Sequence, residues 1–219
     1  MKPIAYIMAL LCLTLTLTGC KDKFEDEPKD DFSDNWKDRN DAFFAETMAT
    51  AREAIAQAQA EYGDDWQSHT PWRLFISYAK MPSYALLTDS IIVKVKKQGT
   101  GPGCPLFTDS VKVNYRGHVM PTDNYSFDDG VGGKVGRVFD HSGLYESDDY
   151  VFNETLATPT RFMVSNMVEG YTTVLQHMHV GDRWLVYIPR QLGYDGGSSG
   201  VLPAYSTLIF DTELKAYWR

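Results

Sequence analysis

The sequence predicts an α+β fold, in which an N-terminal helical segment precedes an antiparallel sheet crossed by one short helix. Residues 33–61 contain neither Pro nor Gly and are rich in Ala, Glu, Gln and Arg, which favours a helix. From residue 90 onward, apolar side chains recur at every second position in several segments, which is typical of strands. Residues 170–178 break this alternation, because their apolar side chains have helical spacing.

The composition is that of a globular protein. The chain has 219 residues, of which 43% are hydrophobic and 23% charged, and this excludes a fully disordered, collagen-like or multi-span membrane protein. The net charge is −8 and no basic run occurs. Nucleic acid is therefore not an expected partner, because phosphate binding requires a clustered basic face.

The first residues are typical of an export signal. Lys2 is followed by an apolar segment, residues 4–17, that is too short to span a bilayer. The sequence Leu17-Thr18-Gly19-Cys20 resembles the lipobox of bacterial lipoproteins, which implies cleavage before Cys20 and acylation of that residue. We therefore expect a lipid anchor on Cys20 that holds the protein to a membrane of the cell envelope, on its extracytoplasmic side. The alternative is a generic signal peptide or a buried N-terminal helix.

Three cysteines are present, and only one remains unassigned under this interpretation. Cys12 is removed with the signal and Cys20 is acylated, so Cys104 has no partner for an intramolecular disulfide. Cys104 lies in a Gly- and Pro-rich turn with no histidine nearby in sequence. We expect an inert loop thiol, and a reactive thiol is the alternative.

The expected organisation is a signal peptide at 1–19, an acidic tether at 20–40, a helix with a connecting segment at 41–89 and the sheet domain at 90–219. The helix, expected to end at Gly63, carries a narrow apolar stripe with spacings of three and four. The stripe comprises Phe44, Met48, Ala51, Ile55, Ala58 and Tyr62. It either packs on the following domain or pairs with a second copy in a homodimer, and its short length favours packing or a spacer role over dimerisation.

The segment between the helix and residue 90 is expected to be irregular, with aromatic anchors onto the domain. These anchors are Trp66, Trp72, Phe75, Tyr78 and Tyr84. The sheet domain that follows contains four clear period-two segments, which are residues 91–95, 111–115, 184–188 and 207–214.

Three motifs suggest other chemistry and lack its context. Residues 196–200 match G-x-S-x-G, yet Pro203 and a strand follow instead of the helix that a nucleophile elbow needs. The glycines of residues 130–136 are misplaced for a dinucleotide loop and also lead into a strand. His177 and His179 have no further ligand close by in sequence, so no metal site is expected.

The remaining motifs resemble, in order, the signature blocks of FKBP-type peptidyl-prolyl isomerases. The blocks are residues 111–117, 138–142, 162–170, 178–183, 188–194 and 201–214. The resemblance implies an antiparallel half-barrel sheet wrapped around the short helix, with an apolar cleft between them. By position, the cleft residues are Tyr115, Phe139, Asp140, Met167, Val168, Tyr171, Tyr194, Leu202 and Phe210.

The resemblance also implies a reaction, the cis–trans isomerisation of X-Pro bonds, without a covalent intermediate or a cofactor. Together with the expected export signal, it makes exported proteins the expected substrates. The implied catalytic residues are Phe139, Asp140, Tyr194 and Phe210, and the implied substrate-binding residues are Tyr115, Met167, Val168, Tyr171 and Leu202. This chain has Tyr171 where the family often has Trp, and it has two long connections, 120–136 and 143–161. The alternative function is a catalytically weak peptide-binding or chaperone module that uses the same cleft.

Overall fold

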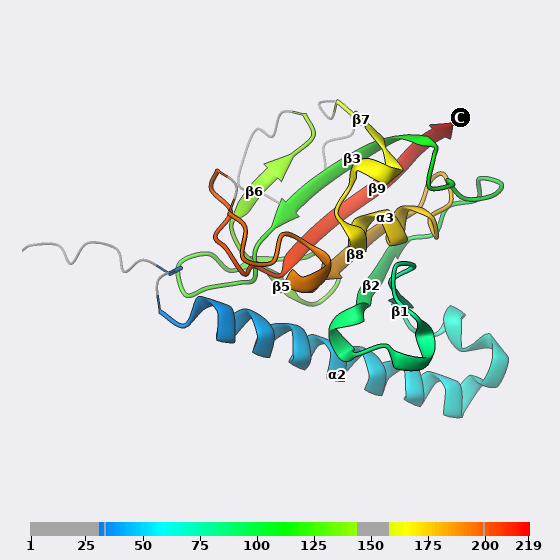
Figure 1. Ribbon diagram of the computed structural model, residues 1–219. Helices are drawn as coiled ribbons and strands as arrows, with labels where there is room; N and C mark the ends of the chain where they lie inside the picture. The colour runs from blue at the N-terminus through cyan, green and yellow to red at the C-terminus, as the bar shows by residue number, and fades with distance from the viewer. Residues whose placement is uncertain (1–30, 33, 144–157, 199) are drawn as a thin grey trace, which may run out of the picture. The chain divides into compact units, whose positions relative to one another are not determined.

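The computed structural model of the protein describes residues 31–32, 34–143, 158–198 and 200–219 (Figure 1). The expected signal peptide, Cys20 and most of the tether lie outside the described residues, as does most of the connection after Gly143. Residues 31–219 form one compact unit, and the boundary expected at residue 90 falls within it, at the first residue of a strand. None of the described helices is long and apolar enough to cross a membrane.

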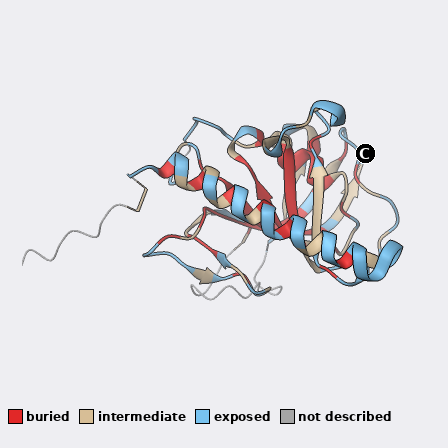
Figure 2. Cartoon of the chain, turned by 90° about the horizontal axis from the view of Figure 1, so that it is seen from below, coloured by how far each residue is buried: buried red, intermediate tan, exposed pale blue. Residues whose placement is uncertain are grey.

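Helix α2 (Trp36–Tyr62) confirms the predicted helix and ends at Gly63, whose φ of 56° suits a residue without a Cβ. It begins inside the stretch that was expected to be tether up to residue 40. The apolar stripe faces the sheet. Phe44, Met48 and Ala51 are buried in a cluster with side chains of the strands β2 (Ser90–Lys97), β8 (Arg183–Ile188) and β9 (Leu208–Trp218), and Figure 2 shows this buried face.

Two polar contacts fix the start of α2 on the chain segment that precedes β9. The Trp36 Nε1–H donates to Ser206 Oγ at 3.0 Å, and the Thr207 N–H donates to Asn40 Oδ1 at 2.7 Å. Asn40 is fully buried, so this hydrogen bond satisfies a side chain that would otherwise be costly to bury. The structure thus shows the stripe packed within the chain.

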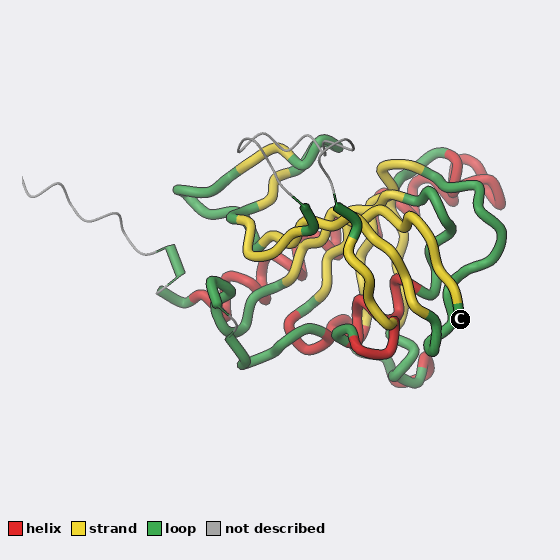
Figure 3. Tube along the Cα trace, turned by 90° about the horizontal axis from the view of Figure 1, so that it is seen from above, coloured by secondary structure: helices red, strands yellow, loops and turns green. Residues whose placement is uncertain are grey.

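The described strands form two antiparallel sheets. The larger sheet has the strand order β1-β2-β8-β9-β3-β6, with β7 paired to β3, and Figure 3 shows its strands side by side. The smaller sheet pairs β4 with β5. The strands are β1 (Trp72–Ile76), β2 (Ser90–Lys97), β3 (Ser110–His118), β4 (Phe127–Asp128), β5 (Lys134–Val135), β6 (Val138–His141), β7 (Thr160–Met163), β8 (Arg183–Ile188) and β9 (Leu208–Trp218). The predicted antiparallel α+β architecture is confirmed.

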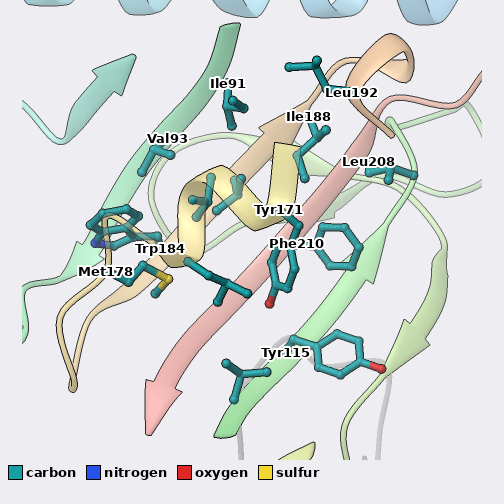
Figure 4. Close-up of a cluster of buried hydrophobic side chains, with 14 of the residues drawn as sticks. Ile91, Val93, Tyr115, Tyr171, Met178, Trp184, Ile188, Leu192, Leu208 and Phe210 are labelled. Atoms are coloured by element: carbon teal, nitrogen blue, oxygen red, sulfur yellow. The ribbon is translucent and has the colours of Figure 1, made fainter. Parts of the chain in front are cut away.

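Helix α3 (Glu169–Leu175) is the predicted short helix, and it lies against the larger sheet. Its residues Tyr171, Val174 and Leu175 belong to the main buried cluster, together with side chains of β2, β3, β8 and β9 (Figure 4). Val174 and Leu175 are completely buried. The helix therefore supplies part of the core, which sets the position of its first turn relative to β9.

The connection between α2 and β2 is more regular than expected. It contains short 3₁₀ turns and the edge strand β1, which pairs with β2 in a register that places Leu74 opposite Ile92. Phe75 packs against the core, stacking on Trp184 at 5.8 Å between ring centroids. Tyr78 contacts the domain as predicted, since its ring stacks on His177 at 5.0 Å between centroids, although it is 59% exposed. Tyr84 is 81% exposed, so the prediction that it anchors this segment is wrong.

Candidate functional site

A group of aromatic rings gathers where α3 faces β3, β6 and β9, with Phe210 at its centre (Figure 4). The ring centroid of Phe210 lies 4.9 Å from Tyr171, 5.6 Å from Phe139 and 6.2 Å from Tyr115. These separations are those of favourable tilted and edge-to-face pairs. We call Tyr115, Phe139, Tyr171 and Phe210 the aromatic cluster. Sequence analysis assigned all four to the cleft.

Gly117 of β3 makes this cluster possible. In the strand register it lies opposite Asp140 of β6 on one side and Phe210 of β9 on the other. A Cβ at this position would lie 2.7 Å from Phe139 Cζ and 2.8 Å from Phe210 Cε1, closer than real contacts allow. The two rings therefore meet over the bare backbone of Gly117, a requirement that the sequence alone did not reveal.

The carboxylate of Asp140 lies at the rim of the cluster and is held by two hydrogen bonds. Its Oδ2 accepts from the Tyr115 hydroxyl at 2.9 Å, and its Oδ1 accepts from the His141 backbone N–H at 2.8 Å. Asp140 is exposed, whereas the preceding Phe139 is half-buried and packs on the core. The pleat of β6 thus directs the ring inward and leaves the charge accessible at the edge of an apolar surface.

Tyr171 packs under Phe210 and is almost completely buried. Its hydroxyl is hydrogen-bonded to Thr212 Oγ1, and Thr212 is itself fully buried. Burial raises the pKa of Tyr171 well above its ordinary value of 10, so the phenol stays protonated. Sequence analysis missed Thr212, although it lies two residues after Phe210 and therefore on the same face of β9.

The remaining predicted wall residues lie next to the cluster. Leu202 is buried in the same core, and Met167 and Val168 pack against it while partly exposed. Val168 precedes the first turn of α3, and its backbone N–H has no acceptor among the described residues. An unused donor at the edge of an apolar site can bond a carbonyl of a bound peptide.

Tyr194, also predicted as a site residue, lies outside the ring contacts that define the aromatic cluster. It lies in the turn after a 3₁₀ helix, η5 (Arg190–Leu192), and its side chain is 49% exposed. Within the described part of the chain it makes no ring contact with the cluster. Conversely, Phe162 of β7 was not predicted as a site residue, and its ring lies 5.5 Å from Tyr115.

Cys104 has a histidine neighbour in space that is distant in sequence. Its Sγ lies 3.7 Å from Nε2 of His179, and Nδ1 of His179 lies 3.6 Å from the Asp182 carboxylate. Burial and the charge of Asp182 raise the pKa of the Cys104 thiol, which keeps it protonated. A raised pKa disfavours the thiolate, which is the nucleophilic form of cysteine. No group of three or more metal-binding side chains is gathered in the described residues.

Comparison with known proteins identifies the family. Residues 105–215, which include the whole aromatic cluster, match the family model of the FKBP-type peptidyl-prolyl cis-trans isomerases. The chain belongs to this family. It is 31% identical over 144 residues to the macrophage infectivity potentiator of Trypanosoma cruzi, a match that covers 65% of this chain and 61% of that protein.

Two further FKBP-type proteins show the extent of the similarity. The isomerase FkpA of Aeromonas hydrophila is 31% identical over 123 residues, covering 56% of this chain and 36% of that protein. The crystal structure of FkpA from Escherichia coli aligns over 98% of this chain and 79% of that one, with a TM-score of 0.42 and 21% identity. The chain thus spans 61% and 36% of the length of the two curated relatives named here.

Proposed function

We propose that this FKBP-type chain catalyses the cis–trans isomerisation of X-Pro peptide bonds without a covalent intermediate. The observation that carries this proposal is the aromatic cluster, which offers a mostly apolar surface with one oriented carboxylate, Asp140, at its rim. Rotation about an X-Pro bond has a barrier of about 18–20 kcal/mol, because resonance keeps the amide planar. Water stabilises the charge-separated planar form, so an apolar site that excludes water lowers this barrier.

Each side chain then has a role that matches its place in the site. The rings of Phe139, Tyr171 and Phe210 hold the prolyl ring, and Met167 and Leu202 form the walls beside it. This arrangement positions the amide in a surface from which water is displaced on binding. No proton transfer and no cofactor is required for the rotation.

The polar groups act on the carbonyls and on the twisting amide. The free backbone N–H of Val168 bonds one substrate carbonyl, and the exposed hydroxyl of Tyr194 bonds another. Asp140 favours the twisted amide electrostatically, since its charge is fixed in direction before the substrate arrives. Tyr115 is a positioning residue, because it acts through its hydrogen bond to Asp140.

A protease-coupled proline isomerisation assay on the full chain tests the proposal. Asp140→Leu is expected to lower kcat/KM roughly tenfold or more, which corresponds to about 1.4 kcal/mol of barrier. Asp38→Leu, at a side chain 78% exposed on α2, is the matched control and should keep the wild-type rate. Wild-type turnover in a folded Asp140→Leu protein would refute the electrostatic role. Peptide binding by the wild-type chain without turnover would instead identify the alternative, a binding module.

The proposed cellular setting is the extracytoplasmic side of the cell envelope, where the substrates are proline-containing segments of exported proteins. The support is in the sequence, which has a short apolar segment ending in Leu17-Thr18-Gly19-Cys20. Acylation of Cys20 followed by a strongly charged stretch gives a membrane anchor with a tether to the folded unit.

Membrane fractionation of the Cys20→Ser variant tests the anchor. The variant is expected to leave the membrane pellet while keeping its isomerase activity, because Cys20 lies outside the compact unit of residues 31–219. A variant that stays in the pellet after a high-salt wash contradicts the lipid anchor.

A further inference from the structure

A hollow of about 470 Å³ lies beside α3, outside the aromatic cluster. It is lined by Thr172 and Thr173 of α3, by Gln176 directly after that helix, and by Tyr78 and Phe107 from the segments that precede β2 and β3. Its volume falls in the range of pockets that accept small ligands or large side chains. The prolyl-bond chemistry proposed above makes no use of this hollow.

Met167 joins the hollow to the aromatic cluster. Its side chain packs against the core that contains Tyr171 and Phe210, and it also lines the hollow. On α3, Tyr171 faces the cluster and the next residue, Thr172, lines the hollow. A peptide seated on the cluster can therefore reach the hollow by passing over Met167 at the start of this helix.

Most polar groups of the helix wall make hydrogen bonds within the protein. The hydroxyl of Thr172 lies 2.9 Å from the Val164 carbonyl, and the hydroxyl of Thr173 donates to the Glu169 carbonyl at 3.2 Å. The amide of Gln176 donates to the Thr172 carbonyl at 3.1 Å. These bonds leave few polar groups to recognise a polar ligand.

The acidic group at the hollow is also partnered. The Glu169 carboxylate accepts a hydrogen bond from the Ser77 hydroxyl at 2.7 Å and lies 3.8 Å from Lys80 Nζ. The apolar rim, in contrast, is open, because Tyr78 is 59% and Phe107 is 55% exposed. Large exposed rings around a hollow whose polar groups are mostly hydrogen-bonded favour an apolar or aromatic side chain as the occupant.

We propose that this hollow is a second subsite for the polypeptide whose X-Pro bond lies on the aromatic cluster, and that it takes an apolar side chain of that polypeptide. The inference rests on the proposed function and adds a substrate preference to it. A helix with its side chains is about 10 Å wide, and an extended chain advances about 3.3 Å per residue. An extended chain therefore needs about three residues to cover that width, so the apolar side chain is about three residues from the proline.

Exchange NMR on proline-containing peptides tests the subsite, with the full chain as enzyme. Ten-residue peptides carry one Ala-Pro bond and either Phe or Ser three residues from the proline, on its N-terminal side in one pair and on its C-terminal side in the other. For one of the two pairs, the wild-type chain is expected to catalyse exchange roughly fivefold to tenfold faster for Phe than for Ser. Equal rates for Phe and Ser in both pairs would overturn the proposal.

Variants at the rim locate the effect. Tyr78→Ala and Phe107→Ala are expected to bring the Phe-to-Ser ratio close to one, and circular dichroism checks that each variant is folded. The matched control is Tyr84→Ala, since Tyr84 is 81% exposed on the same segment and does not line the hollow. A wild-type ratio in both rim variants, or an equal loss in Tyr84→Ala, would refute the assignment.

A tetrapeptide with the same Ala-Pro bond separates this inference from the proposed function. If the wild-type chain does not isomerise the tetrapeptide, the proposed function fails. In that case, the fluorescence anisotropy of labelled Phe and Ser decapeptides tests whether the hollow binds an apolar side chain. Tighter binding of the Phe peptide that Tyr78→Ala abolishes supports the subsite, and equal affinity for both peptides overturns it.

Discussion

Acid is predicted to destabilise this protein through one buried histidine. His118 of β3 is 1% exposed, and its Nδ1–H donates to the Gly136 carbonyl at 3.0 Å. Burial lowers the pKa of His118 from 6.5 to about 4. The hydrogen bond to Gly136 and the charge of Asp211 oppose this shift but do not cancel it, and Arg116 and Lys96 add to it.

The direction and size of the effect follow from this shift. In the unfolded chain the imidazole takes up its proton near pH 6.5, whereas in the folded protein it stays neutral until about pH 4. The stabilising contribution of the neutral form is therefore complete above pH 6.5 and is lost as the pH falls towards 4. Each pH unit in this window costs about 1.4 kcal/mol, so about 3 kcal/mol is lost between pH 7 and 4.

Urea unfolding of the wild-type chain and of His118→Asn at pH 7 and pH 4 measures the effect. The Asn amide can still donate to the Gly136 carbonyl but does not titrate. The variant is expected to be less stable at pH 7, and the gap to wild type should shrink by about 3 kcal/mol at pH 4. His69→Gln, at an exposed ion pair, is the control and should follow the wild-type curve. Parallel curves for wild type and His118→Asn would refute the reasoning.

Three further predictions concern the site. In Gly117→Ala the new Cβ forces the two rings above it to move by about 0.7 Å to reach an ordinary 3.4 Å contact. We therefore expect kcat/KM in the protease-coupled assay to fall tenfold or more, and the free energy of unfolding in urea to fall by about 1–3 kcal/mol. Tyr171→Phe leaves the Thr212 hydroxyl buried without its partner, so the free energy of unfolding should fall by about 1–2 kcal/mol. The double variant Tyr171→Phe/Thr212→Val should recover part of that loss, because it removes the unpaired hydroxyl. If no proton transfer occurs, kcat/KM should be nearly flat between about pH 6 and 8.5, and a reagent that blocks Cys104 should not change it. A bell-shaped pH profile would instead require an acid–base group, and inhibition by the reagent would require a nucleophile.

Sequence patterns predicted two kinds of element. One is the strand in which apolar and polar side chains alternate, and the other is the helix built mainly from helix-favouring residues. The Ala-rich stretch without glycine gave helix α2, and alternation gave four strands of the larger sheet. The edge strand β1 was missed because four of its five residues are half-buried, so neither face alternates. Tyr84 is expected to be an anchor because it is large and aromatic, a property that does not by itself determine burial.

The residues that support the aromatic cluster depend on pairing between distant strands. Gly117 matters because the register of β3 places it between Phe210 and Asp140, which are distant in sequence from it and from each other. His179 reaches Cys104 across 75 positions of the chain for the same kind of reason. Local periodicity contains no information about such contacts, so they appear only when the sheet is assembled.

The departure of this chain from the family pattern at Tyr171 has a structural answer. A tyrosine in place of tryptophan brings a hydroxyl to the floor of an apolar cleft, where an unpaired polar group would cost about 1–3 kcal/mol and attract water. In this protein the Tyr171 hydroxyl is hydrogen-bonded to Thr212, which lies two residues after Phe210, and both groups are buried. The face of Tyr171 towards Phe210 is therefore purely aromatic. Since desolvation of the X-Pro amide is the proposed source of catalysis, the exchange of tryptophan for tyrosine preserves the property on which the reaction depends.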